Sequence, residues 1–100
     1  MYYTEGKKVK DDNNAVIISF SSRSSVFSLH EGLKKENVNS KIISTPAIAK
    51  MACGLSVEID GKFYLQAVRL AARLGLRITA VFVAKKSRNG VSYVRIQNLQ

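Results

Sequence analysis

The chain has 100 residues, 46% of them apolar, and its 16 Lys and Arg against seven Asp and Glu give a net charge of +9. This length excludes two ordinary hydrophobic cores, and the apolar share excludes a chain too polar to fold. Its single cysteine excludes an internal disulfide, and one cysteine with one histidine cannot make a zinc site within one chain. The positive charge favours an anionic partner, either nucleic acid or an acidic protein surface.

Residues 1–14 are polar and charged, and we expect a tail ahead of a single domain that spans residues 15–100. No apolar segment at the start resembles a secretion signal, and no apolar run is long enough to cross a membrane. Together with the unpaired thiol, this indicates a reducing, cytoplasmic setting with no membrane partner. The chain has no phosphate-binding glycine loop and no cluster of metal ligands, so we expect no cofactor and no metal.

The first elements are predicted from a short apolar run and a run of hydroxyls. Residues 15–20 are mostly β-branched and apolar, which predicts a buried strand. The serines of residues 21–25 are suited to cap a helix over about residues 24–37, with Asn37 as its left-handed end. The side chains expected on the apolar face of that helix are Val26, Phe27, His30 and Leu33.

The middle of the chain predicts two strands joined by a loop. Residues 41–44 form the second strand, which Pro46 ends because proline offers no N–H to a ladder. Residues 47–52 are suited to one or two helical turns. The third strand covers residues 55–59 and ends in a turn at Asp60-Gly61.

The last part of the chain predicts a second helix and a hairpin. The helix covers residues 63–74 and closes at Gly75. A fourth strand over residues 77–84 should place Ile78, Ala80, Phe82 and Ala84 on one face, and Thr79, Val81 and Val83 on the other. An Asn-Gly turn within residues 87–90 leads to a fifth strand over residues 91–96.

The order of these elements predicts an α+β fold. The order β-α-β-β-α-β is that of the ferredoxin-like split βαβ fold, here with an appended C-terminal hairpin strand. The handedness of βαβ units then places the third and fourth strands on either side of the first. Two helices should cover one face of the sheet.

This layout makes Cys53 the strongest candidate for chemistry. The loop after the first strand and the loop that holds Cys53 should meet at one end of the sheet, beside the N-terminus of the first helix. Free N–H groups and the positive dipole end of that helix favour a thiolate or another bound anion. The residues expected to stabilise the anion are Ser22, Arg23, Ser24, Ser25, Lys50, Gly54 and Arg77. A true helix over residues 47–52 would act against this, since its negative end would face the thiol. A cysteine that serves only as a small packing residue remains the alternative.

The segment Phe20-Ser21-Ser22 and, more specifically, Thr45-Pro46 followed six residues later by Cys53-Gly54-Leu55-Ser56-Val57 resemble the DUF3343 family. Members of that family are described as selenium/sulfur carrier-like proteins, and the similarity covers about residues 15–84. The resemblance implies that Cys53 carries sulfur or selenium as a persulfide or selenosulfide. It also implies a carrier rather than a turnover enzyme, with sulfur- or selenium-transfer proteins as partners.

Two other classes of function stay open at this stage. A basic RNA-binding module is one, because ferredoxin-like sheets serve in RNA recognition, although no base-stacking motif surrounds Phe82 or Tyr93. The basic residues that would serve it are Lys62, Arg69, Arg73, Lys85, Lys86 and Arg88. The other is a protein-interaction domain that pairs a sheet edge or its last strand with a second chain, in a complex or a homodimer.

Overall fold

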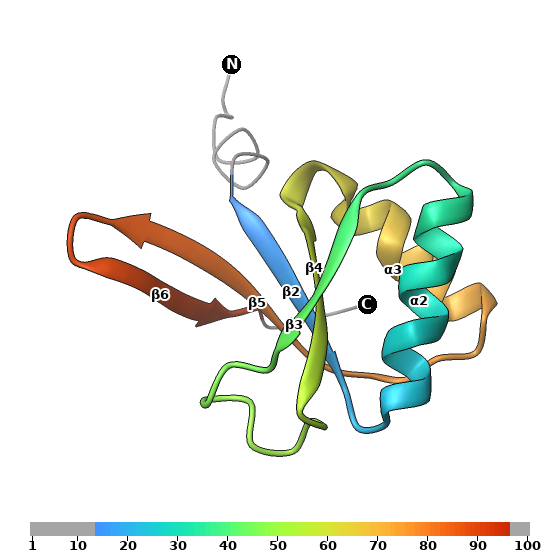
Figure 1. The fold of residues 1–100 in the computed structure, drawn as a ribbon, viewed down its shortest axis with the longest axis horizontal. Helices are drawn as coiled ribbons and strands as arrows, with labels where there is room; N and C mark the ends of the chain where they lie inside the picture. Colours follow the sequence, from blue (N-terminus) through green and yellow to red (C-terminus); the bar gives the residue numbers. More distant parts are fainter. Residues whose placement is uncertain (1–13, 97–100) are drawn as a thin grey trace.

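The computed structural model describes residues 14–96, so the predicted tail lies almost wholly outside the described residues (Figure 1). The fold is α+β, with one antiparallel sheet and two α-helices. The elements in chain order are β2 (Ala15–Phe20), α2 (Arg23–Lys35), β3 (Ser40–Ser44), β4 (Leu55–Asp60), the 3-10 turn η1 (Gly61–Phe63), α3 (Tyr64–Arg73), β5 (Ile78–Ser87) and β6 (Gly90–Arg95). All the predicted elements are therefore present, with ends shifted by up to three residues, except a helix over residues 47–52.

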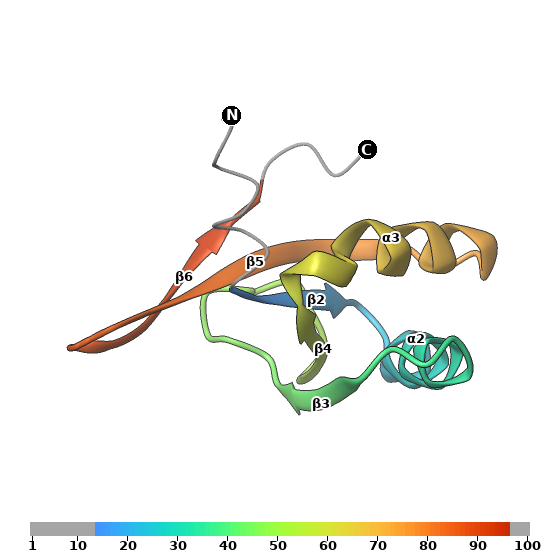
Figure 2. The same cartoon turned by 90° about the horizontal axis from the view of Figure 1, so that it is seen from above.

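Strand β2 is the centre of the sheet. The sheet has five strands in the order β3-β4-β2-β5-β6, and all neighbours are antiparallel. Strands β4 and β5 flank β2, as the handedness rule predicts. Both helices lie over the same face of the sheet, while the β5–β6 hairpin extends away from them (Figures 1 and 2).

The serine run starts α2 as predicted. Ser22 is the N-cap, and its hydroxyl accepts a hydrogen bond from the backbone N–H of Ser25 at 3.4 Å. At the other end Asn37 has a φ of 63°, the left-handed conformation that follows many helices. Asparagine tolerates this conformation better than most residues with a side chain.

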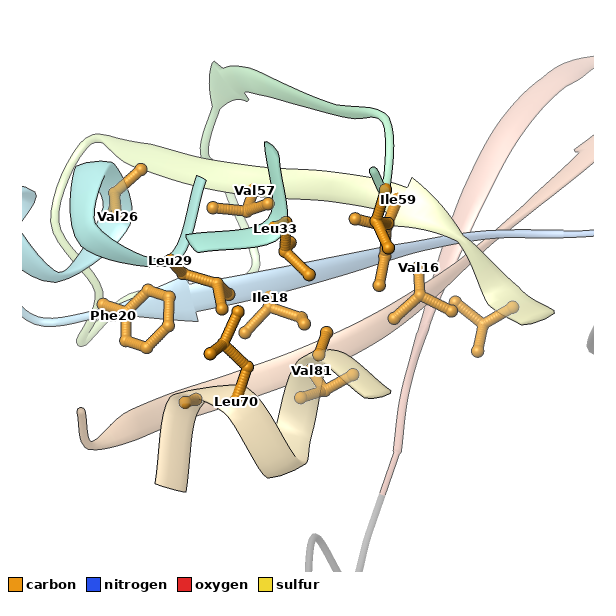
Figure 3. Close-up of a cluster of buried hydrophobic side chains, with 14 residues drawn as sticks. Val16, Ile18, Phe20, Val26, Leu29, Leu33, Val57, Ile59, Leu70 and Val81 are labelled. Carbon is orange, nitrogen blue, oxygen red and sulfur yellow. The ribbon is translucent and has the colours of Figure 1, made fainter. Parts of the chain in front are cut away.

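The main core lies between the helices and the sheet (Figure 3). Its fully buried side chains include Ile18 and Phe20 of β2, Val57 of β4 and Val81 of β5, together with Val26, Leu29 and Leu33 of α2. The predicted apolar face of α2 was wrong at Phe27, which is 48% exposed. Leu29 takes the buried position because residues 26, 29 and 33 follow the helical period, whereas residue 27 lies one step around the helix.

A β-bulge corrects the predicted faces of β5. Ser19 pairs with Ala80, but Phe20 pairs with Ile78, so one extra residue is inserted in β5. Ile78 consequently packs with Val81 and Val83 against the helices instead of with Ala80 on the opposite face. The opposite face has its own small cluster, formed by Ile17, Ala80, Phe82 and Ala84 with the partly buried Ala15, Ile43 and Ala49.

A polar contact joins the two helices. Glu36, which follows α2, accepts hydrogen bonds from Gln66 at 2.9 Å and from Arg73 at 2.7 Å. These two hydrogen bonds lower the pKa of the Glu36 carboxyl below its usual range, and the bond from Gln66 has the larger effect. Gln66 and Arg73 therefore connect α3 to the C-terminal end of α2.

The core assignment makes a stability prediction. Leu29→Ala should lower the free energy of unfolding by about 2–5 kcal/mol, because it removes a fully buried side chain and leaves a cavity. Phe27→Ala, two positions away on the same helix, should change it by only about 0.5 kcal/mol, since Phe27 is half exposed. Urea titrations measure both values, and an equal loss in the two variants would contradict the assignment.

Candidate functional site

The backbone of Cys53 is held directly against the central strand. Its N–H donates to the carbonyl of Phe20, the last residue of β2, at 2.7 Å. Ser21 and Ser22, which follow Phe20, lead into α2. Cys53 therefore lies at the end of the sheet where that helix begins. Figure 1 shows β4 and α2 starting at this same end. The predicted meeting of the Cys53 loop with the start of α2 is therefore confirmed at the level of the backbone.

The loop between β3 and β4 is built from two tight turns. The N–H of Ala49 donates to the carbonyl of Pro46 at 3.0 Å, and the N–H of Ala52 donates to the carbonyl of Ala49 at 3.3 Å. Residues 47–52 form no helix. The negative helix end that would have faced Cys53 is therefore absent. Ala49 packs against the cluster on the open face of the sheet and anchors the middle of the loop.

A chain of three hydroxyls closes the loop at its base. Thr45 Oγ1 donates to the carbonyl of Cys53 at 2.8 Å and lies 2.6 Å from Ser56 Oγ, which lies 2.8 Å from Ser19 Oγ. A carbonyl only accepts, so Thr45 uses its one proton on Cys53. Ser56 must then donate to Thr45, and Ser19 must donate to Ser56.

This hydroxyl chain supports the site from inside the protein. Ser19 and Ser56 are fully buried and face each other across β2 and β4. A buried hydroxyl without a partner destabilises the fold. The two serines therefore favour the one position of Thr45 in which every hydroxyl of the chain is paired. The backbone N–H of Thr45 also donates to the carbonyl of Gly54 at 3.0 Å. Both ends of the Cys53 loop are thus fixed to each other and to the sheet.

Cys53 is partly buried and forms no disulfide. Cys53 packs partly against the core between the helices and the sheet. Its Sγ donates to the carbonyl of Leu55 at 3.2 Å. A thiol is a weak donor, so this bond orients the sulfur without holding it against reaction.

Three exposed cations belong to the segments that meet at this end of the sheet. Arg23 is the first residue of α2, and Lys50 lies in the loop that leads to Cys53. Arg77 directly precedes β5, whose first residue Ile78 pairs with Phe20. The remaining predicted site residues are Ser22, Ser24 and Ser25, which share hydrogen bonds at the helix cap, and the exposed Gly54. That these groups stabilise an anion stays a prediction.

Sequence reasoning missed the hydroxyl chain. A signal for it was present, because Ser19 and Ser56 each interrupt an apolar strand with a small polar residue. A polar residue at a buried strand position needs a partner, and two such residues on neighbouring strands can supply one another. Their register, and hence the contact with Thr45, comes from the pairing of β2 with β4.

The residues considered for RNA binding are divided among three elements, and Lys62 belongs to η1. Lys85, Lys86 and Arg88 belong to the β5–β6 hairpin, whereas Arg69 and Arg73 belong to α3, on another side of the molecule (Figure 1). Phe82 is 1% exposed and so offers no face for a base to stack on.

A model of the protein family described as "Putative Se/S carrier protein-like" matches residues 15–83. The chain belongs to this family. The match runs from β2 into β5 and includes Cys53 and the whole hydroxyl chain, while β6 lies outside it. Comparisons with curated proteins and with solved structures gave no match.

Within residues 14–96, no helix is long and apolar enough to span a membrane. The same residues contain no group of three or more His, Cys, Asp or Glu side chains placed to hold a metal ion.

The direction of the hydroxyl chain makes the second prediction. Thr45→Val keeps the shape of the side chain but leaves the Ser56 proton and the Cys53 carbonyl without their partner. We expect a loss of about 1–3 kcal/mol in the free energy of unfolding, because a buried donor is left unpaired. Thr45→Ser retains the hydroxyl and should lose less than Thr45→Val. Urea titrations measure both variants, and a Thr45→Val protein as stable as the wild type would show that the chain does not support the loop.

Proposed function

We propose that this protein carries sulfur or selenium on Cys53 and hands it between partner proteins. The observation that carries the proposal is the structure around the chain's one cysteine. Its backbone is tied to Phe20 and Thr45, while its thiol forms no disulfide and the residue is only partly buried. The family to which the chain belongs supports the same chemistry.

The transfer needs no oxidant or cofactor. The thiolate of Cys53 attacks the outer sulfur of a donor persulfide, a new S–S bond forms to Cys53, and the donor's S–S bond breaks. The donor leaves as a thiol after taking one proton, and Cys53 becomes the persulfide. Selenium transfer follows the same balance, with an S–Se bond formed and an S–Se bond broken. An acceptor thiolate then repeats the step on the loaded Cys53.

The surroundings of Cys53 suit a group that must be charged when it attacks and when it leaves. The N-terminus of α2 offers backbone N–H groups and the positive end of its dipole. Arg23, Lys50 and Arg77 add positive charge on the segments that meet there. A persulfide is an anion too, so the same groups would favour the loaded state.

We also interpret the architecture as a ferredoxin-like split βαβ fold with β6 added at one edge. The central position of β2 between β4 and β5 and the two helices on one face support this interpretation. Such a fold supplies a rigid sheet end on which a short loop can present a thiol. The protein would act as a carrier in the cytoplasm, with sulfur- or selenium-transfer proteins as its partners. No observation on residues 14–96 favours the RNA module or a homodimer.

Mass spectrometry of the intact protein tests the proposal. After incubation with a cysteine desulfurase and cysteine, the wild type should gain the mass of one sulfur atom, and dithiothreitol should remove it. Cys53→Ser should gain nothing while remaining folded. Iodoacetamide labelling of the wild type serves as the control for an accessible thiol. A thiol that reacts with iodoacetamide but never gains sulfur would refute the carrier proposal.

A further inference from the structure

The loop that leads to Cys53 turns large apolar side chains outward. Met51 is 82% exposed and Ile48 is 53% exposed, while Ala49 between them packs inward. The two turn hydrogen bonds of the loop fix this alternation. Isolated exposed apolar residues are common, but Ile48 and Met51 are exposed together on one short loop that is fixed by hydrogen bonds and leads directly to Cys53. We call this pair the apolar spot.

The charge around this apolar spot has one sign. Between Ser44 and Val57 the sequence has Lys50 but neither Asp nor Glu. The first turn of α2 also lacks an acidic residue. Within residues 14–96 the structure shows one ion pair, Arg73 with Glu36, so the cations near Cys53 are not neutralised by neighbours.

We propose that these residues form a docking face for an acidic protein surface that presents its own cysteine to Cys53. The docking face consists of Arg23, Ile48, Lys50, Met51 and Arg77. This inference rests on the proposed carrier function and adds the chemistry of the partner: Glu and Asp side chains around a small apolar centre. Complementary charges would steer the encounter, and the apolar spot would exclude water at the point of contact.

The side chains of the docking face fit a carrier that meets two partners in turn. Methionine is flexible and polarisable, so it packs against differently shaped apolar surfaces. Lysine and arginine on the rim act mainly on the association rate and leave dissociation fast. Donor and acceptor can therefore use the same face one after the other. A second copy of this chain is a poor occupant, because it would bring the same positive charge against itself.

Disulfide exchange with short peptides tests this choice of partner. Three peptides of equal length carry a central Leu-Cys pair flanked by Glu, Gln or Lys, and each cysteine is activated as a mixed disulfide with 2-thiopyridine. Cys53 attacks the peptide sulfur, a protein–peptide disulfide forms, and 2-thiopyridone leaves and is followed by its absorbance. Each rate is divided by the rate with dithiodipyridine, a small uncharged disulfide, which removes effects on the thiol's own reactivity.

The acidic peptide should react fastest and the basic peptide slowest, with a ratio of about tenfold or more at low salt that shrinks as salt is added. Lys50→Glu should abolish this preference. Lys86→Glu, an equal charge change at an exposed lysine of the β5–β6 hairpin, should keep most of it. Met51→Ser should slow all three peptides about threefold or more, whereas Leu65→Ser, at a residue 62% exposed on α3, should not.

Several outcomes would overturn the docking face. Equal rates for the three peptides would remove its charge preference, and an equal effect of Lys50→Glu and Lys86→Glu would reduce that preference to net charge. Tight binding of oligo-uridine that blocks the acidic peptide would make RNA the occupant. A preference for the acidic peptide without sulfur loading of Cys53 would support the docking face but refute the carrier function. Sulfur loading without a peptide preference would support the carrier function but refute the docking face.

Discussion

The hydrogen bond from the N–H of Cys53 to the carbonyl of Phe20 connects the parts of this molecule on which its proposed function depends. Phe20 ends the central strand, which is paired on both sides, and its ring is fully buried in the core. The position of Cys53 is therefore set by the most constrained strand of the sheet and not by the loop alone. The next residues after Phe20 cap α2, so one short segment sets both the thiol's backbone and the helix N-terminus beside it.

The buried hydroxyls have a similar role on the opposite face of the sheet. A strand made wholly of apolar residues would bury more surface at the positions of Ser19 and Ser56. Serines at these positions bury less apolar surface, but they form a chain of hydrogen bonds that ends at the carbonyl of Cys53. Because each hydroxyl has one proton, the chain has one satisfied arrangement, and a displaced loop would leave buried groups unpaired. A rigid loop suits a carrier, because both partners must find the sulfur in the same place.

The distribution of charge and apolar surface separates two regions of the protein. At the Cys53 end, the exposed Met51 and Ile48 lie in a loop that has one cation, Lys50, and no acid. At the far end of β5, strand β6 is exposed along its whole length and lies outside the family match. The net charge alone does not distinguish an RNA from an acidic protein surface. The buried ring of Phe82 and the division of the basic residues between α3 and the hairpin favour the protein surface.

The local sequence pattern was sufficient to predict most of the helices, strands and turns. The β-branched run of residues 15–20, the serine cap, Asn37 after the helix and the Asn-Gly hairpin each act through nearby backbone, so each could be read from sequence. The element order with the handedness rule also placed Cys53 beside the start of α2. Tertiary contacts decided the rest. The bulge that turns Ile78 toward the helices depends on pairing with β2, and the exposure of Phe27 depends on how α2 packs. The hydroxyl chain joins residues from three different segments, Ser19 being 37 residues from Ser56, so its partners meet only once β2, β3 and β4 are in register.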